Sequence, residues 1–165
     1  MSQSLEDRLA RLEAESDIRR LKARYLNACD RKDVEAMRAC FTEDAVIDFP
    51  PLGEFDLDGL VGIFTQMAVS RPITDVHQGH NAEITVSGDT AEAVWNLGFA
   101  TFDPREETFR LLSSFYTDRY RKTDDGWRIC YTRSEPRAII DGKLEAGSVK
   151  ANWLDMTAAP DAESA

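Results

Sequence analysis

The sequence predicts one α+β domain, in which helices come first and long antiparallel strands follow. Apolar residues recur at helical spacing as far as Asp30, and two shorter helical segments come before Pro72. Beyond Pro72 the chain is rich in strand formers, and short turn segments divide it. With 165 residues, the chain is long enough to bury one core. We expect residues 1–147 to form the domain and residues 148–165 to form a C-terminal tail.

The first predicted helix runs from about Ser4 to Asp30. Ser4 and Asp7 have the spacing of an N-cap with an acidic partner. One apolar stripe then follows at three-, four- or six-residue steps, made by Leu5, Leu9, Leu12, Ile18, Leu21, Tyr25 and Cys29. At about 100° per residue, Asp30 lies at the edge of this stripe. Its carboxylate can therefore reach an interior space without sitting in the middle of the core.

Two shorter helices and one strand come next. The residues DRKD open a helix over Val34–Phe41, and TEDAVIDFP is typical of a helix end followed by a strand. The segment PPLGEF predicts a turn, because it contains two prolines and a glycine. Asp58–Ser70 predicts a third helix, whose apolar side carries Leu60, Ile63, Phe64 and Met67.

The second half predicts long strands joined by tight turns. HNAEITVSGDTAEAVWNLGFATF gives two strands that meet at SGDT. A third strand spans roughly Phe109–Lys122, and TDDGW turns into a last strand over Trp127–Ile140. A sheet of this size with helices on one face curves, and a curved sheet can enclose an apolar pocket.

The composition excludes several classes of partner. A formal net charge of −10 argues against nucleic acid and anionic membrane surfaces, which attract clustered Lys and Arg. No apolar run approaches the ~20 residues of a membrane span, and the polar start has no signal-peptide core. The odd cysteine count, at Cys29, Cys40 and Cys130, matches no zinc or disulfide framework. We expect reduced thiols and a cytoplasmic location.

Asp30 and His77 are the candidate catalytic pair. The chain has only two histidines, and His77 begins a strand, so a carboxylate from the first helix could orient its imidazole as a general base. The alternative is an ordinary hydrogen-bonded strand histidine. His80 lies three residues further on and faces the other way along a strand. Tyr25 is a candidate acid, with core packing as its alternative.

The strands also supply candidate pocket walls. Trp95, Leu97 and Phe99 share one strand face, and Leu112 and Tyr116 share a face of the next strand. The alternative for most of these residues is a hydrophobic core beneath the helices. Near the end of the last strand, Arg133 could bind an anionic group. We expect no metal and no cofactor, because no ligand spacing or nucleotide-binding fingerprint occurs.

Three segments resemble the SnoaL-like branch of the NTF2-like superfamily: RYLNACDRKDVEAMRACFTEDAVIDF, VHQGHNAEITVSGDTAEAVW and YTDRYRKTDDGWRI. The resemblance implies a cone-shaped, curved, mixed or antiparallel sheet with three N-terminal helices closing a pocket. It also places Asp30 and His77 on the Asp–His pair of the dehydratases and dehydrochlorinases in this branch. Tyr25 matches a tyrosine of bile-acid dehydratases, and Arg133 lies close to a pocket arginine.

Together these features predict a cofactor-independent lyase, dehydratase-like, acting on a small hydrophobic cyclic substrate. His77 would take a proton from carbon, Asp30 would orient it, and Tyr25 would assist the leaving hydroxyl. An isomerase or polyketide-cyclase-like enzyme with the same base, and a non-catalytic small-molecule-binding protein, are the alternatives. We expect a homo-oligomer, a dimer or a trimer, because the open side of such a sheet needs cover.

Overall fold

A computed structural model describes residues 4–145 and 148–155. Its helices are α1 (Leu5–Arg31), α2 (Val34–Arg38), α3 (Leu57–Phe64) and a π-helical turn, η1 (Thr65–Val69), that continues α3. Its strands are β1 (Phe41–Phe49), β2 (Gly53–Phe55), β3 (Thr74–Ser87), β4 (Thr90–Asp103), β5 (Thr108–Thr123), β6 (Gly126–Glu145) and β7 (Ser148–Asp155). The predicted α+β order is confirmed.

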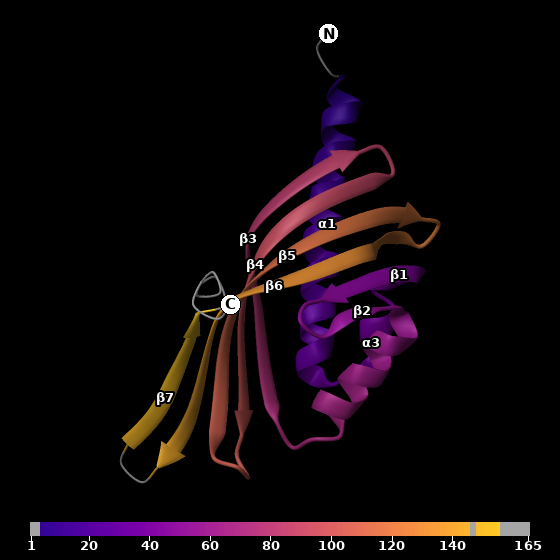
Figure 1. Cartoon of the computed structure of the whole chain (residues 1–165). Helices are drawn as coiled ribbons and strands as arrows, with labels where there is room; N and C mark the ends of the chain where they lie inside the picture. The colour runs from indigo at the N-terminus through magenta and orange to yellow at the C-terminus, as the bar shows by residue number, and fades with distance from the viewer. Residues whose placement is uncertain (1–3, 146–147, 156–165) are drawn as a thin grey trace, which may run out of the picture.

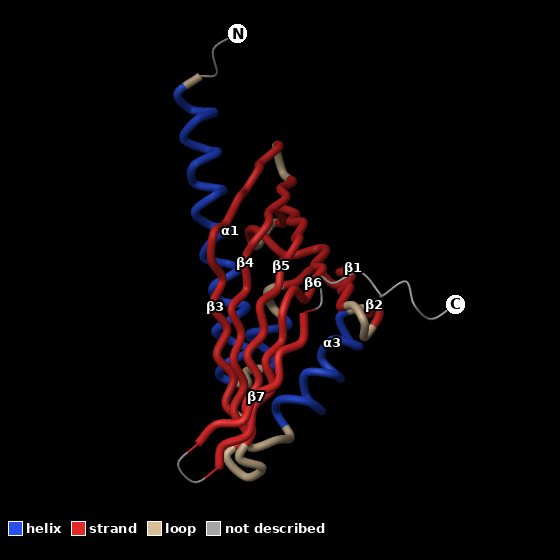
Figure 2. Tube along the Cα trace, turned by 60° about the vertical axis from the view of Figure 1, so that its left-hand side comes forward, coloured by secondary structure: helices blue, strands red, loops and turns tan. Residues whose placement is uncertain are grey.

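All seven strands form one curved sheet in the order β2-β1-β6-β5-β4-β3, with β7 paired to β6. The β1–β6 pair is parallel and the other pairs are antiparallel. In Figure 1, α1 passes behind the upper ends of β3–β6, and their lower ends swing away from it together with β7. Figure 2 shows α1 and α3 as separate helices, α1 beside β3 and α3 beside β1 and β2. The sheet therefore packs on α1 with one half, and its other half extends beyond this helix.

Helix α1 begins at the predicted cap. The Ser4 hydroxyl accepts from the Asp7 backbone N–H at 3.0 Å, and Asp7 accepts from the Ser4 N–H at 3.1 Å. The apolar stripe is buried only from Ala14 onward. Leu5, Leu9 and Leu12 are 78, 55 and 58% exposed, because the first turns of α1 extend beyond the sheet (Figure 1).

Three boundaries differ from the expectations. The second helix ends at Arg38, because Phe41 already pairs with β6 and begins β1. The third predicted helix is divided into α3 and η1. Strand β6 continues to Glu145, and residues 148–155, which the sequence had placed in a tail, pair with it as β7. Residues 156–165 lie outside the described part of the chain.

The core lies between α1 and the sheet. Ile18 and Leu21 of α1 are almost fully buried against Trp95, Leu97 and other strand residues. The Trp95 indole N–H donates to the Tyr120 hydroxyl at 3.0 Å inside this core. Apolar burial of this extent is the main stabilising contribution to the fold.

A buried ion pair crosses the same core. The Lys22 ammonium, on α1, lies 2.7 Å from the Asp118 carboxylate on β5, and their side chains are 1 and 0% exposed. The Tyr120 and Thr132 hydroxyls both donate to Asp118 at 2.7 Å. Asp118 thus has three partners, which compensates for the cost of burying its charge.

Candidate active site

The first helix and the third strand bring Asp30 and His77 together. Asp30 sits in the last turn of α1, which ends at Lys32 in a left-handed conformation (φ 59°). Gly79, two residues beyond His77 on β3, permits the close approach of α1. A Cβ added at Gly79 would lie 3.0 Å from the Leu26 side chain of α1.

The Asp30 carboxylate holds His77 at two points. The His77 Nδ1 lies 2.6 Å from Asp30 Oδ1, and the His77 backbone N–H donates to the same carboxylate at 3.1 and 3.2 Å. An ionised carboxylate only accepts hydrogen bonds, so the neutral imidazole carries its proton on Nδ1. Its Nε2 is then unprotonated and can accept a proton.

Burial sets the charge state of this imidazole. It lowers the pKa of His77 below the ordinary value of 6.5, whereas the hydrogen bond and the charge of Asp30 raise it. Burial is the larger of these effects, so His77 is mainly neutral near pH 7. A neutral, oriented imidazole has the protonation state that a general base requires.

His77 lies on the wall of a cavity of about 660 Å³ between the sheet and α3–η1. Its ring packs against Phe99, with ring centroids 4.5 Å apart. The rest of this end of the cavity is mostly apolar and includes Met37, Phe49, Leu60, Ile63, Phe64 and Met67. Such a space accommodates a hydrophobic ring against His77.

Tyr25 and Tyr116 also line the cavity. Burial raises the pKa of both phenols, so both stay protonated and can donate a proton or a hydrogen bond. The Lys22 ammonium lies 4.0 Å from the centroid of the Tyr116 ring and 5.3 Å from that of Tyr25. Cys29 lines the same space, and burial raises the pKa of its thiol to about 12, so it is not a thiolate nucleophile.

The structure separates the other candidate pocket residues. Phe99 borders the cavity, but Trp95 and Leu97 of the same strand face pack in the core under α1. Leu112 borders a different hollow. Arg133 does not reach the cavity; it pairs with Asp48 and with Glu135. The curvature of the sheet explains the difference between Phe99 and the pair Trp95 and Leu97, because residues on one face of β4 meet α1 at one end of the strand and the cavity at the other.

Sequence reasoning missed Lys22 and Asp75. Lys22 interrupts the apolar stripe of α1 between Leu21 and Tyr25, and a lone lysine in such a stripe signals a buried partner. Asp75 shares the β3 face of His77, lines the cavity, is 7% exposed and pairs with Lys32. The sequence did contain a signal for Asp75: it lies two residues before His77, and residues at this spacing on a strand share one face.

Two further findings concern the described residues alone. Within residues 4–145 and 148–155, no group of three or more His, Cys, Asp or Glu side chains is placed to hold a metal ion. In that same part of the chain, no helix is both long enough and apolar enough to cross a membrane.

The fold and the site together define a class of protein: a small α+β domain with a curved sheet, an apolar cavity and a His–Asp pair on its wall. The model of the SnoaL-like domain family matches residues 10–133, and the chain belongs to this family. An uncharacterised protein of Mycobacterium tuberculosis is 28% identical over 116 residues, which cover 68% of this chain and 78% of that protein.

Solved structures share the fold. That of LinA superposes with a TM-score of 0.73 at 18% identity and covers 85% of this chain and 95% of its own. A hexachlorocyclohexane dehydrochlorinase, LinA-type3 from Novosphingobium barchaimii, has a TM-score of 0.68 at 18% identity, and the match covers 90% of this chain and 94% of that one. An NTF2-like protein from Novosphingobium aromaticivorans has a TM-score of 0.67 at 25% identity, and the match covers 79% of this chain and 86% of that one. The NTF2-like fold that the sequence predicted is confirmed.

Proposed function

We propose that the protein is a cofactor-independent lyase, dehydratase-like, that acts on a small hydrophobic cyclic substrate. The observation that carries this proposal is the 2.6 Å contact between His77 Nδ1 and Asp30 Oδ1 on the wall of an apolar cavity. The fold shared with a hexachlorocyclohexane dehydrochlorinase supports it, because that protein is also named as an eliminating enzyme.

The proposed step is an elimination. His77 Nε2 takes a proton from a substrate carbon, and the electron pair of the broken C–H bond forms the new C=C bond. The neighbouring C–O bond breaks, and the Tyr25 phenol donates a proton so that the hydroxyl leaves as water. The imidazolium, stabilised by Asp30, then returns a proton to Tyr25 through solvent or the cavity. Atoms and charge balance without an oxidant or a reductant.

Product analysis tests this chemistry. Purified protein would be incubated with a panel of hydroxylated cyclic compounds in D2O, and products would be examined by mass spectrometry and NMR. A lyase yields an alkene with the loss of one water. Deuterium incorporation or rearrangement without loss of water would instead identify an isomerase or cyclase that uses the same base. Recovery of every bound compound unchanged would favour a binding protein.

A further prediction concerns how activity falls as the pH is lowered. Because burial holds the pKa of His77 below 6.5, the midpoint of the acid limb of kcat/KM should lie below pH 6.5, where the imidazole becomes protonated. In Asp30→Asn the limb should move to still lower pH, because the charge that raises this pKa is gone. Stopped-time assays from pH 4.5 to 8 measure this shift. A limb that moves upward in Asp30→Asn contradicts the assignment.

We also propose that the protein forms a dimer or a trimer. Val76, Phe102 and Leu111 lie on the outer part of the sheet and are 38, 43 and 40% exposed. Exposed apolar side chains of neighbouring strands favour association. Light scattering on the purified protein tests this, and a monomer at all concentrations contradicts it.

A further inference from the structure

The cavity has a second, charged end. Beyond the apolar residues around His77, the lining changes to side chains from the far ends of β5, β6 and β7 and from the segment before β3. Four cationic side chains line this outer end: Arg71, Arg110, Lys143 and Lys150. The cavity therefore offers an apolar chamber and a cationic mouth to one ligand.

Two lysines, Lys143 and Lys150, lie side by side at this mouth, and only one of them has an acidic partner in the described part of the chain. They are directly opposite each other in the β6–β7 register, an arrangement that is unfavourable for two like charges. Lys150 pairs with Glu145 at 3.0 Å. Among the residues that the structure describes, no carboxylate lies within ion-pair distance of the Lys143 ammonium.

The two arginines are already neutralised. Arg110 donates twice to Asp141, at 2.6 and 2.9 Å, and Arg71 pairs with Asp103 at 3.2 Å. Lys150 is likewise paired with Glu145, so the positive charge that remains at the mouth comes from Lys143.

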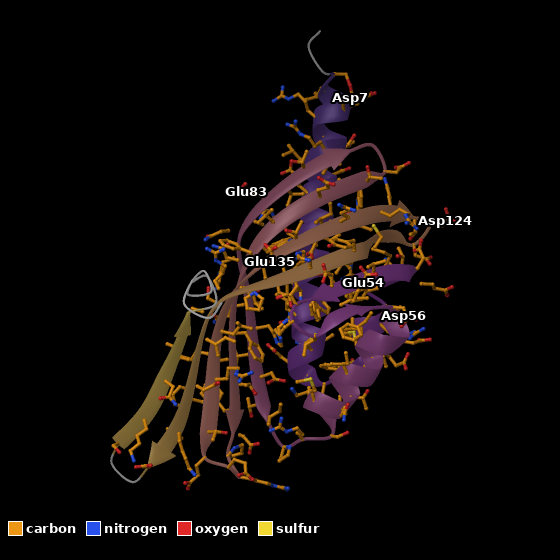
Figure 3. All side chains as sticks on the ribbon, viewed as in Figure 1. Asp7, Glu54, Asp56, Glu83, Asp124 and Glu135 are labelled. Atoms are coloured by element: carbon orange, nitrogen blue, oxygen red, sulfur yellow. The ribbon has the colours of Figure 1, made fainter. Side chains whose placement is uncertain are left out.

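This positive end stands out because the chain carries a net charge of −10. Figure 3 shows exposed acidic side chains, such as Asp7, Glu83 and Asp124, at the outer edges of the molecule, and none of these three lines the cavity. A ligand's anionic group would therefore be repelled by much of the surface and attracted at the cavity mouth.

We infer that the substrate is amphiphilic, with an apolar ring in the chamber beside His77 and an anionic group held by Lys143 and Lys150. The inference rests on the proposed function for the ring and adds the second group that the protein recognises. A cavity of about 660 Å³ has room for both parts, since ligand pockets of ~300–1,000 Å³ hold drug-sized molecules. The anionic group is a carboxylate, sulfonate or phosphate, all of which two ammonium groups can bind.

Two fluorescent probes with the same rings test this inference. Anilinonaphthalene sulfonate carries an anionic group, and N-phenylnaphthylamine is the same ring system without it. Fluorescence titrations at low salt would compare wild type with the double variant Lys143→Gln/Lys150→Gln. The control is Lys122→Gln, an exposed lysine near the turn between β5 and β6 and outside the cavity lining.

We expect wild type to bind the sulfonate more tightly than the neutral probe. The double variant should lose roughly fivefold in sulfonate affinity and keep its affinity for the neutral probe, whereas Lys122→Gln should change neither. Equal sulfonate affinities in wild type and the double variant would overturn the inference. Millimolar inorganic phosphate at constant ionic strength should weaken sulfonate binding in wild type and leave the neutral probe unaffected, and equal displacement of both probes would also overturn the inference.

His77→Ala separates this inference from the proposed catalysis. Its ratio of sulfonate to neutral-probe affinity should equal that of wild type, because His77 lies in the apolar chamber and away from the lysines. A normal ratio together with normal turnover would refute the catalytic proposal alone. A loss of the sulfonate preference in His77→Ala would refute the placement of the anion at the mouth.

Discussion

Replacing His77 by Gln is expected to lower turnover at least ~10²-fold, since a positioned general base contributes about that factor or more. Gln keeps much of the side-chain size and polarity, but it cannot take a proton from carbon. The backbone N–H of residue 77 still donates to Asp30, so the contact between α1 and β3 survives. Initial rates on a substrate found in the compound panel measure the loss.

Asp30→Asn should also lower turnover, but for a different reason. The amide cannot stabilise the imidazolium, and its NH2 group can stabilise the wrong tautomer of His77. The matched control is His80→Gln, which changes the second histidine of the same strand at an exposed position. Wild-type rates in His77→Gln and Asp30→Asn, with thermal melting unchanged, would exclude the pair as the catalyst.

Removing one partner of the buried ion pair should have the largest effect on stability. Lys22→Met leaves the Asp118 carboxylate buried without its counter-ion, and such changes cost about 3–5 kcal/mol in the free energy of unfolding. Urea unfolding of wild type and Lys22→Met measures the difference. Asp118→Asn should be destabilising as well, because the Lys22 ammonium then loses its charged partner.

A double-mutant cycle separates the ion pair from packing. Lys22→Met combined with Asp118→Asn should lose less stability than the sum of the two single losses, because no charge is left buried and uncompensated. The exposed pair Arg121–Asp44 provides the control, and Arg121→Gln should have a much smaller effect because solvent screens that pair. A loss below ~1 kcal/mol in Lys22→Met would show that the charges are not isolated from water.

The Asp30–His77 contact could be predicted from the sequence because two local rules determine it. Helical geometry places Asp30 at the edge of the buried stripe, and strand alternation places His77 on the inner face of β3. The resemblance to a family with a known helix–strand pairing then selected these two residues from the many Asp and the two His.

The pocket wall could not be predicted by the same rules. Alternation assigns Trp95, Leu97 and Phe99 correctly to one face of β4, but it does not show where the curving sheet leaves α1. Only the structure shows that Phe99 borders the cavity while Trp95 lies in the core. The position of Arg133 near the end of a strand also did not show where its side chain points. It pairs with Asp48 of the neighbouring strand β1 and does not reach the cavity.

Strand β7 and the charged mouth could not be predicted from the sequence, because both form only through pairing between strands. Residues 148–155 were interpreted as part of a polar tail, although Val149, Ala151 and Trp153 alternate with polar residues, because the segment is short and its pairing with β6 is not visible in the sequence. Lys143 and Lys150 are seven residues apart, and nothing in their spacing places them at a cavity. Their pairing across β6 and β7 brings them there.

The central claim is that His77 is neutral, protonated on Nδ1 by its bond to Asp30, and free to accept a proton on Nε2. Nitrogen-15 NMR of labelled histidines at pH 7 measures this tautomer directly, and Asp30→Asn and His80→Gln assign the signal. We predict a protonated Nδ1, an unprotonated Nε2 and titration below pH 6.5. A His77 protonated on Nε2 at pH 7, or one whose tautomer is unchanged in Asp30→Asn, would contradict the account.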